Sequence, residues 1–304
     1  MLIRMRTGAG MIRDFKTILT ALAEEVQEHL QDCLKIEGIP LDLQKAMEYS
    51  LLAGGKKIRP VLCLSWGEML GADRKELLHF AAALEMIHTY SLVHDDLPAM
   101  DNDDLRRGRP TNHKMFGEAV AILAGDALLT QAFFVMLGSS LPSERVLAAC
   151  REVAAAAGPQ GMVGGQCLDL MATGMGSMNL EDLKNMHALK TGALIRASCT
   201  SGALLAGDSA DVHKAASYGT NIGLAFQIVD DILDVTGDEQ TLGKPVGSDL
   251  SSDKSTYPKF LGIEQSKAMA QDSAELAKAC LDEYHGPQKE FLKSLAQYIV
   301  DRIY

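Results

Sequence analysis

Residues 75–104 read KELLHFAAALEMIHTYSLVHDDLPAMDNDD, an apolar run that ends in a dense group of acids. The run carries Leu84, Ile87 and Leu92, and its apolar residues recur at the spacing of a helix over 75–94. We therefore predict a buried helix. The acids that follow it leave the interior of the protein and are not simply displayed on a solvated face.

The same periodicity recurs along the chain. Phe15, Leu19, Leu22 and Val26 share one helix face, and Gly or Pro clusters separate the later runs. Leu, Ala and 15 Met dominate the apolar residues, which favours helices over strands. We predict an all-α bundle of about ten helices. Its further helices are expected at 41–52, 118–137, 143–157, 180–205, 211–235, 266–284 and 288–303.

Nothing between residues 15 and 235 resembles a linker, so we expect one domain at 11–304 after a short, disordered leader at 1–10. Residues 236–259 break the helical pattern and read TGDEQTLGKPVGSDLSSDKSTYPK. A polar loop of this length inside a compact domain is usually a functional lid or a linker. Its lysines favour the lid.

Composition excludes several classes of protein. The 29 basic and 40 acidic residues give a net charge of −11, which argues against nucleic acid or an anionic membrane as a partner. Residues 119–137 are strongly apolar but carry Asp126 and Gln131, so they predict a buried helix and not a membrane span. The start of the chain has no signal-peptide pattern, and six scattered cysteines without a CxxC pair indicate a reduced, cytoplasmic protein.

Two acidic clusters carry the chemistry. Pro98 disfavours helical geometry at Leu97, so Asp101 is expected to return on a bend toward Asp95. In the second cluster, Asp230 and Asp234 are i, i+4 neighbours on one helix face. Paired carboxylates without a nearby His or Cys suit Mg²⁺, which usually completes its coordination with substrate phosphates and water. The two clusters therefore predict one multi-metal site that holds a diphosphate.

Basic residues accompany both clusters. Lys56 and Arg59 follow the glycine turn 54–55, which suits a second anionic group. Lys190 interrupts an apolar helix, where a cation without a partner would be costly. Lys244 and Lys254 lie in the polar loop after the second cluster. Taken together, these cations predict a site for two anionic groups.

These residues form recognisable motifs. The segments GGKKIRP, DDLPAMDNDDLRRG, GGQCLDL, LKTGALI and GLAFQIVDDILDVTGD occur in this order, followed by LGKPVGSDLSSDKSTYP. From about residue 43 to residue 257 the chain resembles the trans-isoprenyl diphosphate synthases, especially the farnesyl-forming bacterial members. The resemblance implies a homodimer of the isoprenoid synthase type, with helices around a deep central cavity. It also implies Mg²⁺-dependent condensation of isopentenyl diphosphate with dimethylallyl and geranyl diphosphate, giving farnesyl diphosphate and diphosphate.

The resemblance also implies a role for each motif residue. Three Mg²⁺ ions are expected with the allylic substrate bound, two on the first acidic motif and one on Asp230, with Asp231 and Asp234 in support. The metal ligands would be Asp95, Asp96, Asp101 and Asp230; the allylic diphosphate would contact Arg106, Lys190, Thr191, Gln227, Lys244 and Lys254; isopentenyl diphosphate would contact Gly55, Lys56, Arg59, His88 and Arg107.

Product length is expected to depend on Tyr90. It lies five residues before Asp95, about 7.5 Å lower along the helix at 1.5 Å per residue, where its ring could close the cavity. An aromatic residue there resembles the farnesyl-forming type, and a geranylgeranyl diphosphate synthase is the alternative. Asp126, Gln166 and Asp169 lie in family-like motifs, where catalytic positioning and core hydrogen bonding both remain open. The C-terminus lacks the basic pair that many relatives use to close the site.

Three other classes compete with this interpretation. Glu76-x-x-His79 and Glu85-x-x-His88 match the signature of ferritin-like di-metal proteins, but that site needs the two motifs on different helices. A class I terpene cyclase shares the first acidic motif but replaces the second, which is intact here. A non-catalytic partner subunit would normally have lost some of the aspartates.

Overall fold

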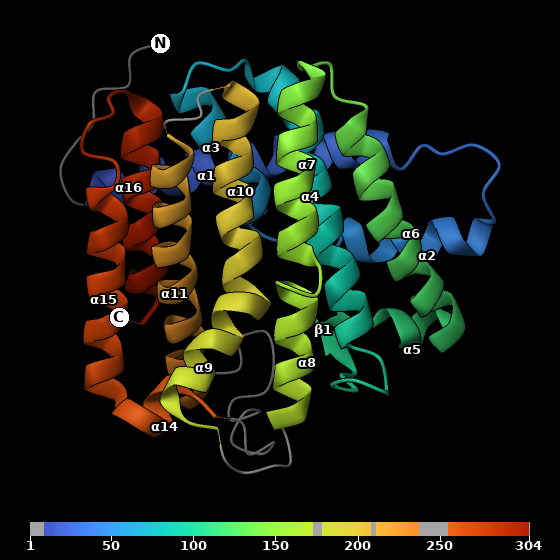
Figure 1. Cartoon of the computed structure of the whole chain (residues 1–304). Coiled ribbons are helices and arrows are strands. Elements are labelled where there is room, and N and C mark those ends of the chain that lie inside the picture. Colours follow the sequence, from blue (N-terminus) through green and yellow to red (C-terminus); the bar gives the residue numbers. More distant parts are fainter. Residues whose placement is uncertain (1–8, 173–177, 208–210, 237–254, 304) are drawn as a thin grey trace.

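The computed structural model describes residues 9–172, 178–207, 211–236 and 255–303, and nearly all of them are helical (Figure 1). The prediction of an all-α protein is confirmed. The elements are α1 (Ala9–Cys33), α2 (Leu41–Leu51), α3 (Ile58–Met69), α4 (Arg74–Asp95), β1 (Leu105–Arg106), β2 (Arg109–Pro110), α5 (Asn112–Phe116), α6 (Glu118–Leu137), α7 (Ser143–Ala157), α8 (Met162–Ala172), α9 (Leu180–His187), η1 (Ala188–Gly192), α10 (Ala193–Ala206), α11 (Val212–Thr236), α14 (Tyr257–Leu261), α15 (Ile263–Ala279), α16 (Pro287–Val300) and η2 (Asp301–Ile303).

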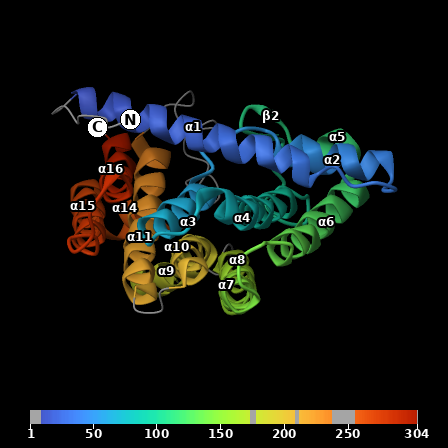
Figure 2. The same cartoon turned by 90° about the horizontal axis from the view of Figure 1, so that it is seen from above.

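Most long helices run side by side, and α1 lies across one side of them (Figures 1 and 2). Helix α4 packs on α3 and α6, while α11 packs on α10 and α15. One apolar core surrounds α4 and a second surrounds α11. Trp66 is fully buried in the second core, where its ring meets Tyr218 and Tyr284 edge-on, with centroids 5.7 Å apart in both pairs. These two cores fix α4 and α11, whose ends carry the acidic motifs.

The predicted helices at 41–52, 143–157 and 211–235 agree with the observed bounds to within a residue at each end. The run predicted at 180–205 is helical throughout, with a π-helical turn at Ala188–Gly192 between α9 and α10. Helix α1 begins at Ala9, so the last two residues of the expected leader are helical, while residues 1–8 lie outside the described residues.

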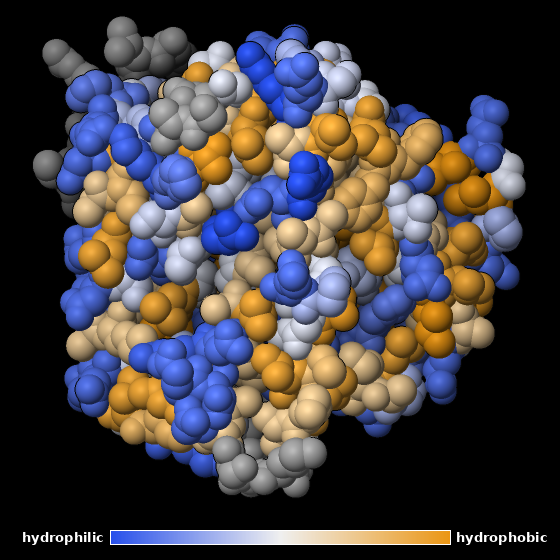
Figure 3. Space-filling view, in the orientation of Figure 1, coloured by the Kyte–Doolittle hydropathy of each residue, from blue (hydrophilic) through white to orange (hydrophobic). Residues whose placement is uncertain are grey.

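Helix α6 corrects the expectation of a buried helix at 119–137. Leu128 is buried, but Leu123 is 57 % exposed and Phe134 is 73 % exposed. This described helix is long and apolar enough to cross a membrane by length and composition, and 39 % of its most apolar window is buried. Periodicity fails here because a helix that is apolar all round shows no preferred face. Orange side chains cover much of the right-hand side in Figure 3, where Figure 1 places α6.

Candidate active site

The first acidic motif begins at the C-terminal end of α4. After Asp95 the chain turns, and the main-chain N–H of Asp101 donates to the carbonyl oxygen of Asp95 at 2.9 Å. Asn102 adopts a left-handed conformation (φ 53°) and donates its own N–H to Leu97 O at 3.1 Å. The bend predicted from Pro98 is therefore present. It brings Asp101 back beside Asp95 and leaves both carboxylates at the helix end.

A two-residue hairpin turn follows the motif. Arg107 and Gly108 both have positive φ (54° and 72°), as the tight turn between β1 and β2 requires. Arg106 thereby faces the acids: its Nε donates to Asp96 Oδ1 at 2.9 Å and its Nη2 to Asp103 Oδ2 at 3.2 Å. Burial raises the pKa of Asp96, and the Arg106 guanidinium opposes part of that rise.

Helix α8 connects the first motif to Lys190. The Gln166 amide donates to Asp95 Oδ1, and one turn further along, Asp169 Oδ2 accepts from Lys190 Nζ at 2.6 Å. A Cβ on Gly165 would lie 2.2 Å from the main-chain nitrogen of Lys190, so only glycine permits this close packing of α8 on η1. Gln166 and Asp169 therefore both contact residues expected at the site, which favours a positioning role for them.

Lys190 lies in the π-helical turn η1 among several acids. Burial alone would lower the pKa of Lys190, but the carboxylates of Asp95, Asp169 and Asp101 outweigh burial and raise it. The ammonium group is therefore charged at neutral pH. Its neighbour Thr191 donates its hydroxyl to Gln227 Oε1 at 3.1 Å, which carries the series of contacts on to α11.

The second acidic motif lies near the end of α11. Gln227 Nε2 donates to Asp231 Oδ1 at 2.8 Å, and the main-chain N–H of Tyr257 donates to Asp231 Oδ2 at 2.9 Å. Asp231 and Asp234 are buried, with 3 % and 1 % of their surface exposed. Asp230 is more open: 36 % of its side chain is exposed, and its Oδ1 accepts from Arg302 Nη1 at 2.8 Å. Of the three acids, Asp230 is the most exposed.

A cationic cluster, made of Arg59, Arg107 and their neighbours, surrounds His88. Burial lowers the pKa of His88 well below its usual value, and the charges of Arg59, Arg107, Lys57 and Arg106 lower it further. The buried Nε of Arg59 has no hydrogen-bond partner among the described residues. The charges of Glu85, Arg107 and Asp230 all act on Arg59. A buried guanidinium N–H without a partner among the described residues is suited to an anionic ligand.

The glycine turn before α3 places Arg107 in this cationic cluster. Gly55 has φ 109°, and a Cβ there would lie 2.8 Å from the Arg107 guanidinium, which donates to the carbonyl oxygen of Gly54. Lys56 is exposed at the edge, with its Nζ 5.1 Å from the centroid of the Tyr298 ring. The turn therefore brings Gly55, Arg59, His88 and Arg107 together and leaves Lys56 at the rim.

Other predicted residues have different surroundings. Tyr90 is buried in the core on α4, with its ring 5.9 Å from that of His94. Asp126 is 61 % exposed on α6, and its Oδ1 lies 3.9 Å from Nε2 of His94, the residue before Asp95. Lys244 and Lys254, with most of the polar loop, lie outside the described residues.

Two further basic residues, to which no role was assigned from the sequence motifs, form ion pairs with acids at or near the site. Arg302, which pairs with Asp230, is the single basic residue among residues 294–304, a signal that could have marked it as a partner for an acid. Lys57 is buried and donates to Glu85 at 3.2 Å. Glu85 lies inside the apolar run 75–94, and a buried carboxylate needs a cation as partner. The sequence could therefore have predicted a buried Lys or Arg near Glu85, which the structure shows to be Lys57.

Residues 41–295 of the chain match the family model of the polyprenyl synthetases. The chain belongs to the polyprenyl synthetase family. It is a trans-prenyltransferase by class, and its elements match the all-α fold of solved isoprenyl diphosphate synthases.

Individual relatives agree with this assignment. A chloroplastic geranylgeranyl pyrophosphate synthase from Capsicum annuum is 45 % identical over 292 residues, covering 95 % of this chain and 79 % of the relative. A dimethylallyltranstransferase from Fischerella ambigua is 43 % identical over 307 residues, covering 97 % and 88 %. The solved structure of an FPP/GFPP synthase from Zymomonas mobilis is 36 % identical with a TM-score of 0.85, covering 95 % and 100 %.

Family membership overturns the ferritin-like alternative. Both of its Glu-x-x-His motifs lie on α4, and their members have other partners: Glu85 pairs with Lys57, and His79 with His29. The terpene-cyclase alternative is overturned as well, because the matched family is that of the polyprenyl synthetases.

Proposed function

We propose that this chain uses Mg²⁺ to condense isopentenyl diphosphate with an allylic diphosphate. The observation that carries the proposal is a series of side-chain hydrogen bonds that, together with short steps along α8 and η1, runs from one acidic motif to the other. From Asp95 it passes through Gln166 and Asp169 on α8, Lys190 and Thr191 on η1, and Gln227 to Asp231 on α11. Two groups of carboxylates held close together repel any anion unless cations lie among them.

The acidic motifs provide a donor set that fits Mg²⁺, because carboxylate oxygens are the hard ligands this ion prefers. Asp95, Asp96 and Asp101 would hold two ions and Asp230 a third, with Asp231 and Asp234 as support. Bound Mg²⁺ supplies positive charge that stabilises the diphosphate as it leaves the allylic carbon. In the free protein, Arg106 and Arg302 balance part of the negative charge of these acids.

Lys190 would contribute the main protein charge toward the allylic diphosphate. Asp169 fixes its ammonium group at 2.6 Å, and the raised pKa keeps it protonated. A preoriented cation in a water-poor site stabilises negative charge that develops on a leaving group. The same diphosphate would also contact Arg106, Thr191, Gln227, Lys244 and Lys254.

Isopentenyl diphosphate would bind at the cationic cluster around His88. Arg59 would contact its diphosphate directly, while His88 would act as a neutral hydrogen-bonding group because its pKa is lowered. Gly55, Lys56 and Arg107 would also contact this diphosphate at the cationic cluster. The double bond would then attack the allylic cation, and a proton would leave to the released diphosphate, so no protein nucleophile is needed.

The test is incubation with labelled isopentenyl diphosphate, Mg²⁺ and each of the dimethylallyl, geranyl and farnesyl starters, followed by chain-length analysis. We expect elongation that stops when Mg²⁺ is chelated and returns when it is restored. A folded protein that elongates no starter would contradict the proposal and favour a non-catalytic partner subunit.

Two candidates remain for the product. The relative from Capsicum annuum is named a geranylgeranyl pyrophosphate synthase, and such names support the twenty-carbon product better than the fifteen-carbon product. The observation on this chain that favours farnesyl diphosphate is Tyr90, whose ring is buried one and a half turns below Asp95. In the assay, a longest product of fifteen carbons supports the Tyr90 argument, and one of twenty supports the inference from the relatives.

Replacement of Tyr90 separates the two candidates further. If its ring closes the prenyl cavity, Tyr90→Ala lengthens the main product by at least one five-carbon unit. Tyr90→Phe keeps the ring and is the matched control, with unchanged product length. If the product of Tyr90→Ala keeps its length, Tyr90 is not the floor of the cavity.

We also propose that a second copy of this chain covers the exposed apolar face of α6. Ile122, Leu123, Phe134 and Leu137 are each between 43 % and 73 % exposed. They share one face of α6 with the exposed Asp126, and several large apolar side chains exposed on one face favour an interface. Phe134→Asp is expected to convert a dimer to a monomer in analytical ultracentrifugation. Leu276→Asp, on exposed α15 surface, is the control and leaves the dimer intact. A monomeric parent protein would overturn the proposal of a dimer.

The cytoplasmic location of the protein stays a prediction.

A further inference from the structure

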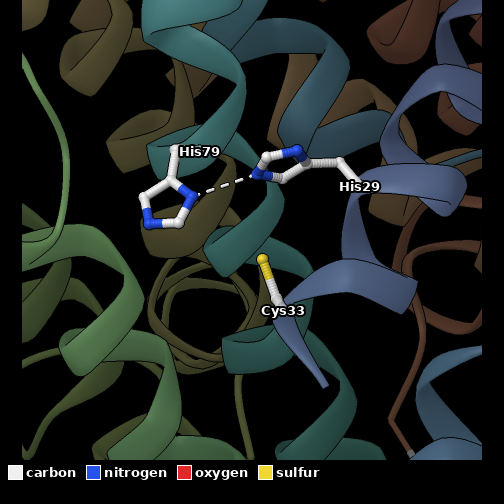
Figure 4. A group of neighbouring side chains, drawn as sticks. All are labelled: His29, Cys33 and His79. Carbon is white, nitrogen blue, oxygen red and sulfur yellow. Dashed lines mark hydrogen bonds between the residues drawn. The ribbon is translucent and has the colours of Figure 1, made fainter. Parts of the chain in front are cut away.

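Outside the acidic site, α1 and α4 bring together three side chains that commonly bind metals: His29, Cys33 and His79. His29 and Cys33 are one helical turn apart on the same face of α1, and His79 lies in the first half of α4. Their potential ligand atoms all lie within 4.8 Å of one another. In Figure 4 the Cys33 sulfur points toward the two imidazoles, which share a hydrogen bond of 3.0 Å between His29 Nε2 and His79 Nδ1.

This geometry is close to that of a tetrahedral zinc site. With Zn–N near 2.05 Å and Zn–S near 2.3 Å, two nitrogen ligands lie about 3.3 Å apart, and a nitrogen and a sulfur about 3.6 Å apart. The His29–His79 distance of 3.0 Å needs to open only slightly, and the sulfur needs a small side-chain rotation. Two imidazoles and one thiolate form a donor set that prefers Zn²⁺ to Mg²⁺.

The protonation states also suit binding. Burial lowers the pKa values of His29 and His79, so both rings are neutral at pH 7. One of the two nitrogens that share the hydrogen bond carries its proton, and metal binding requires that proton to move to the other nitrogen of the same ring, so that both facing nitrogens offer a lone pair. Burial raises the pKa of the Cys33 thiol to about 11, so an incoming M²⁺ must displace its proton. One M²⁺ ion binds the Cys33 sulfur, and the thiol proton is released as H⁺. The oxidation states of the metal and the sulfur do not change. All three residues are half-buried, which leaves a path for the ion.

The cluster is separate from the diphosphate site. His79 precedes Asp95 by sixteen residues on α4, about 24 Å at 1.5 Å per residue. Around it, Asp32 and Glu25 lie close enough to His29 to affect its pKa, and their negative charge favours a cation. Lys35 offsets part of this charge through its ion pair with Asp32 at 2.7 Å.

We propose that His29, Cys33 and His79 bind one Zn²⁺ ion, with water as the fourth ligand, and thereby fasten the end of α1 to α4. The proposal is independent of the prenyltransferase reaction. It assigns a structural site for a thiolate-binding divalent metal to residues that the reaction does not use.

The test uses Co²⁺ as a coloured substitute in the full chain, after chelator treatment and in excess Mg²⁺, which occupies the carboxylate sites. We expect one equivalent of Co²⁺ to give a thiolate-to-metal charge-transfer band with the strong visible bands of tetrahedral cobalt. Zn²⁺ should then displace it. Cobalt held by the carboxylates would be octahedral, weakly coloured and without a thiolate band, so the two sites are spectroscopically distinct.

Variants assign the signal to these residues. Cys33→Ser should abolish the charge-transfer band, and His79→Ala should weaken Zn²⁺ affinity at least about 100-fold, more than loss of an outer-shell contact typically does. Cys280→Ser, at another half-buried cysteine, is the matched control and should keep the band. Prenyltransferase activity in Mg²⁺ should be unchanged in Cys33→Ser.

Three results would overturn the proposal: no thiolate band in the parent protein, a band that survives in Cys33→Ser, or a band lost in Cys280→Ser. If Cys33→Ser fails to fold, His29→Gln gives the same test through its loss of affinity. Zn²⁺ should also raise the melting temperature of the parent protein but not of Cys33→Ser, because an ion that binds only the folded state stabilises it.

Discussion

The acidic motifs at the ends of α4 and α11 begin with the same Asp-Asp pair, yet the chain continues differently after each. After Asp95 it bends, and a main-chain hydrogen bond of 2.9 Å returns Asp101 to the helix end. After Asp230 the helix continues, so Asp234 follows one turn later on the same face. Pro98 is the cause of the difference. It follows Asp95 by three residues and ends α4, whereas no proline follows Asp230 within α11.

The two motifs also use their carboxylates differently. Both oxygens of Asp231 accept hydrogen bonds, from Gln227 and from the main chain of Tyr257, and Asp231 and Asp234 are buried. In the first motif, Asp95 and Asp101 lie close enough to Lys190 to raise its pKa. Each motif thus has a buried, paired carboxylate, Asp96 in the first and Asp231 in the second. We expect Asp95 and Asp101 to bind metal in the first motif and Asp230 alone in the second.

The largest effect is expected at the first motif. Asp101→Asn keeps the main-chain hydrogen bond but removes the charge, and kcat should fall by about 1000-fold, the upper end for loss of one electrostatic group in a preorganised site. The measurement is incorporation of labelled isopentenyl diphosphate. Asp104→Asn is the control, because Asp104 is 75 % exposed and pairs with Lys114. Equal losses in the two variants would contradict the assignment.

A smaller loss is expected for the exposed acid of the second motif. Asp230→Asn should lower kcat by about 100-fold, since it removes one carboxylate from a set of several. Raising the Mg²⁺ concentration should recover part of the loss, because the remaining ligands still bind the ion weakly. A loss at Asp230 larger than that at Asp101 would reverse the ranking of the two motifs.

Asp231 is expected to act mainly through stability. Asp231→Ala leaves the Tyr257 N–H and the Gln227 amide without their acceptor, so the free energy of unfolding should fall by about 2 kcal/mol. Urea denaturation measures this change. Asp230→Ala, next in the chain but more exposed, should cost less than about 1 kcal/mol, typical of a surface ion pair. If both variants unfold alike, Asp231 has no special structural role.

The smallest effect concerns Arg302. Its ion pair with Asp230 competes with any metal at that carboxylate, so Arg302→Gln should lower the Mg²⁺ concentration for half-maximal activity by up to about 5-fold. Lys293→Gln removes a similar ion pair, 2.9 Å to Asp282, away from the motif and should change nothing. A higher Mg²⁺ requirement in Arg302→Gln would show that Arg302 assists binding.

Local rules were sufficient for much of this molecule. The bend at Asp101 was predictable because proline acts on its immediate neighbours, and most helices were predictable because their apolar faces repeat every three or four residues. The apolar periodicity did not predict helix α3, because residues 61–67 are all buried and the helix has no polar face there. The two-sided α6 was misjudged for a related reason, since sequence alone does not show which apolar face another part of the chain covers.

The contacts between motifs were less accessible from sequence. Gln166 meets Asp95 across 71 positions and Arg302 meets Asp230 across 72, and only the packing of whole helices brings such residues together. The resemblance indicated which residues share the site, while the structure adds the order of their contacts. It also shows that Asp169 holds Lys190, a role that neither residue type nor spacing could assign.

The central claim is that both acidic motifs act on one diphosphate through Mg²⁺. The most direct measurement is a crystal structure with Mg²⁺ and a non-reactive allylic diphosphate analogue. We expect electron density for ions that bridge Asp95 and Asp101 to the diphosphate and for another that bridges Asp230 to the same group. A diphosphate held by one motif alone, with the other too far away to share an ion with it, would contradict the account.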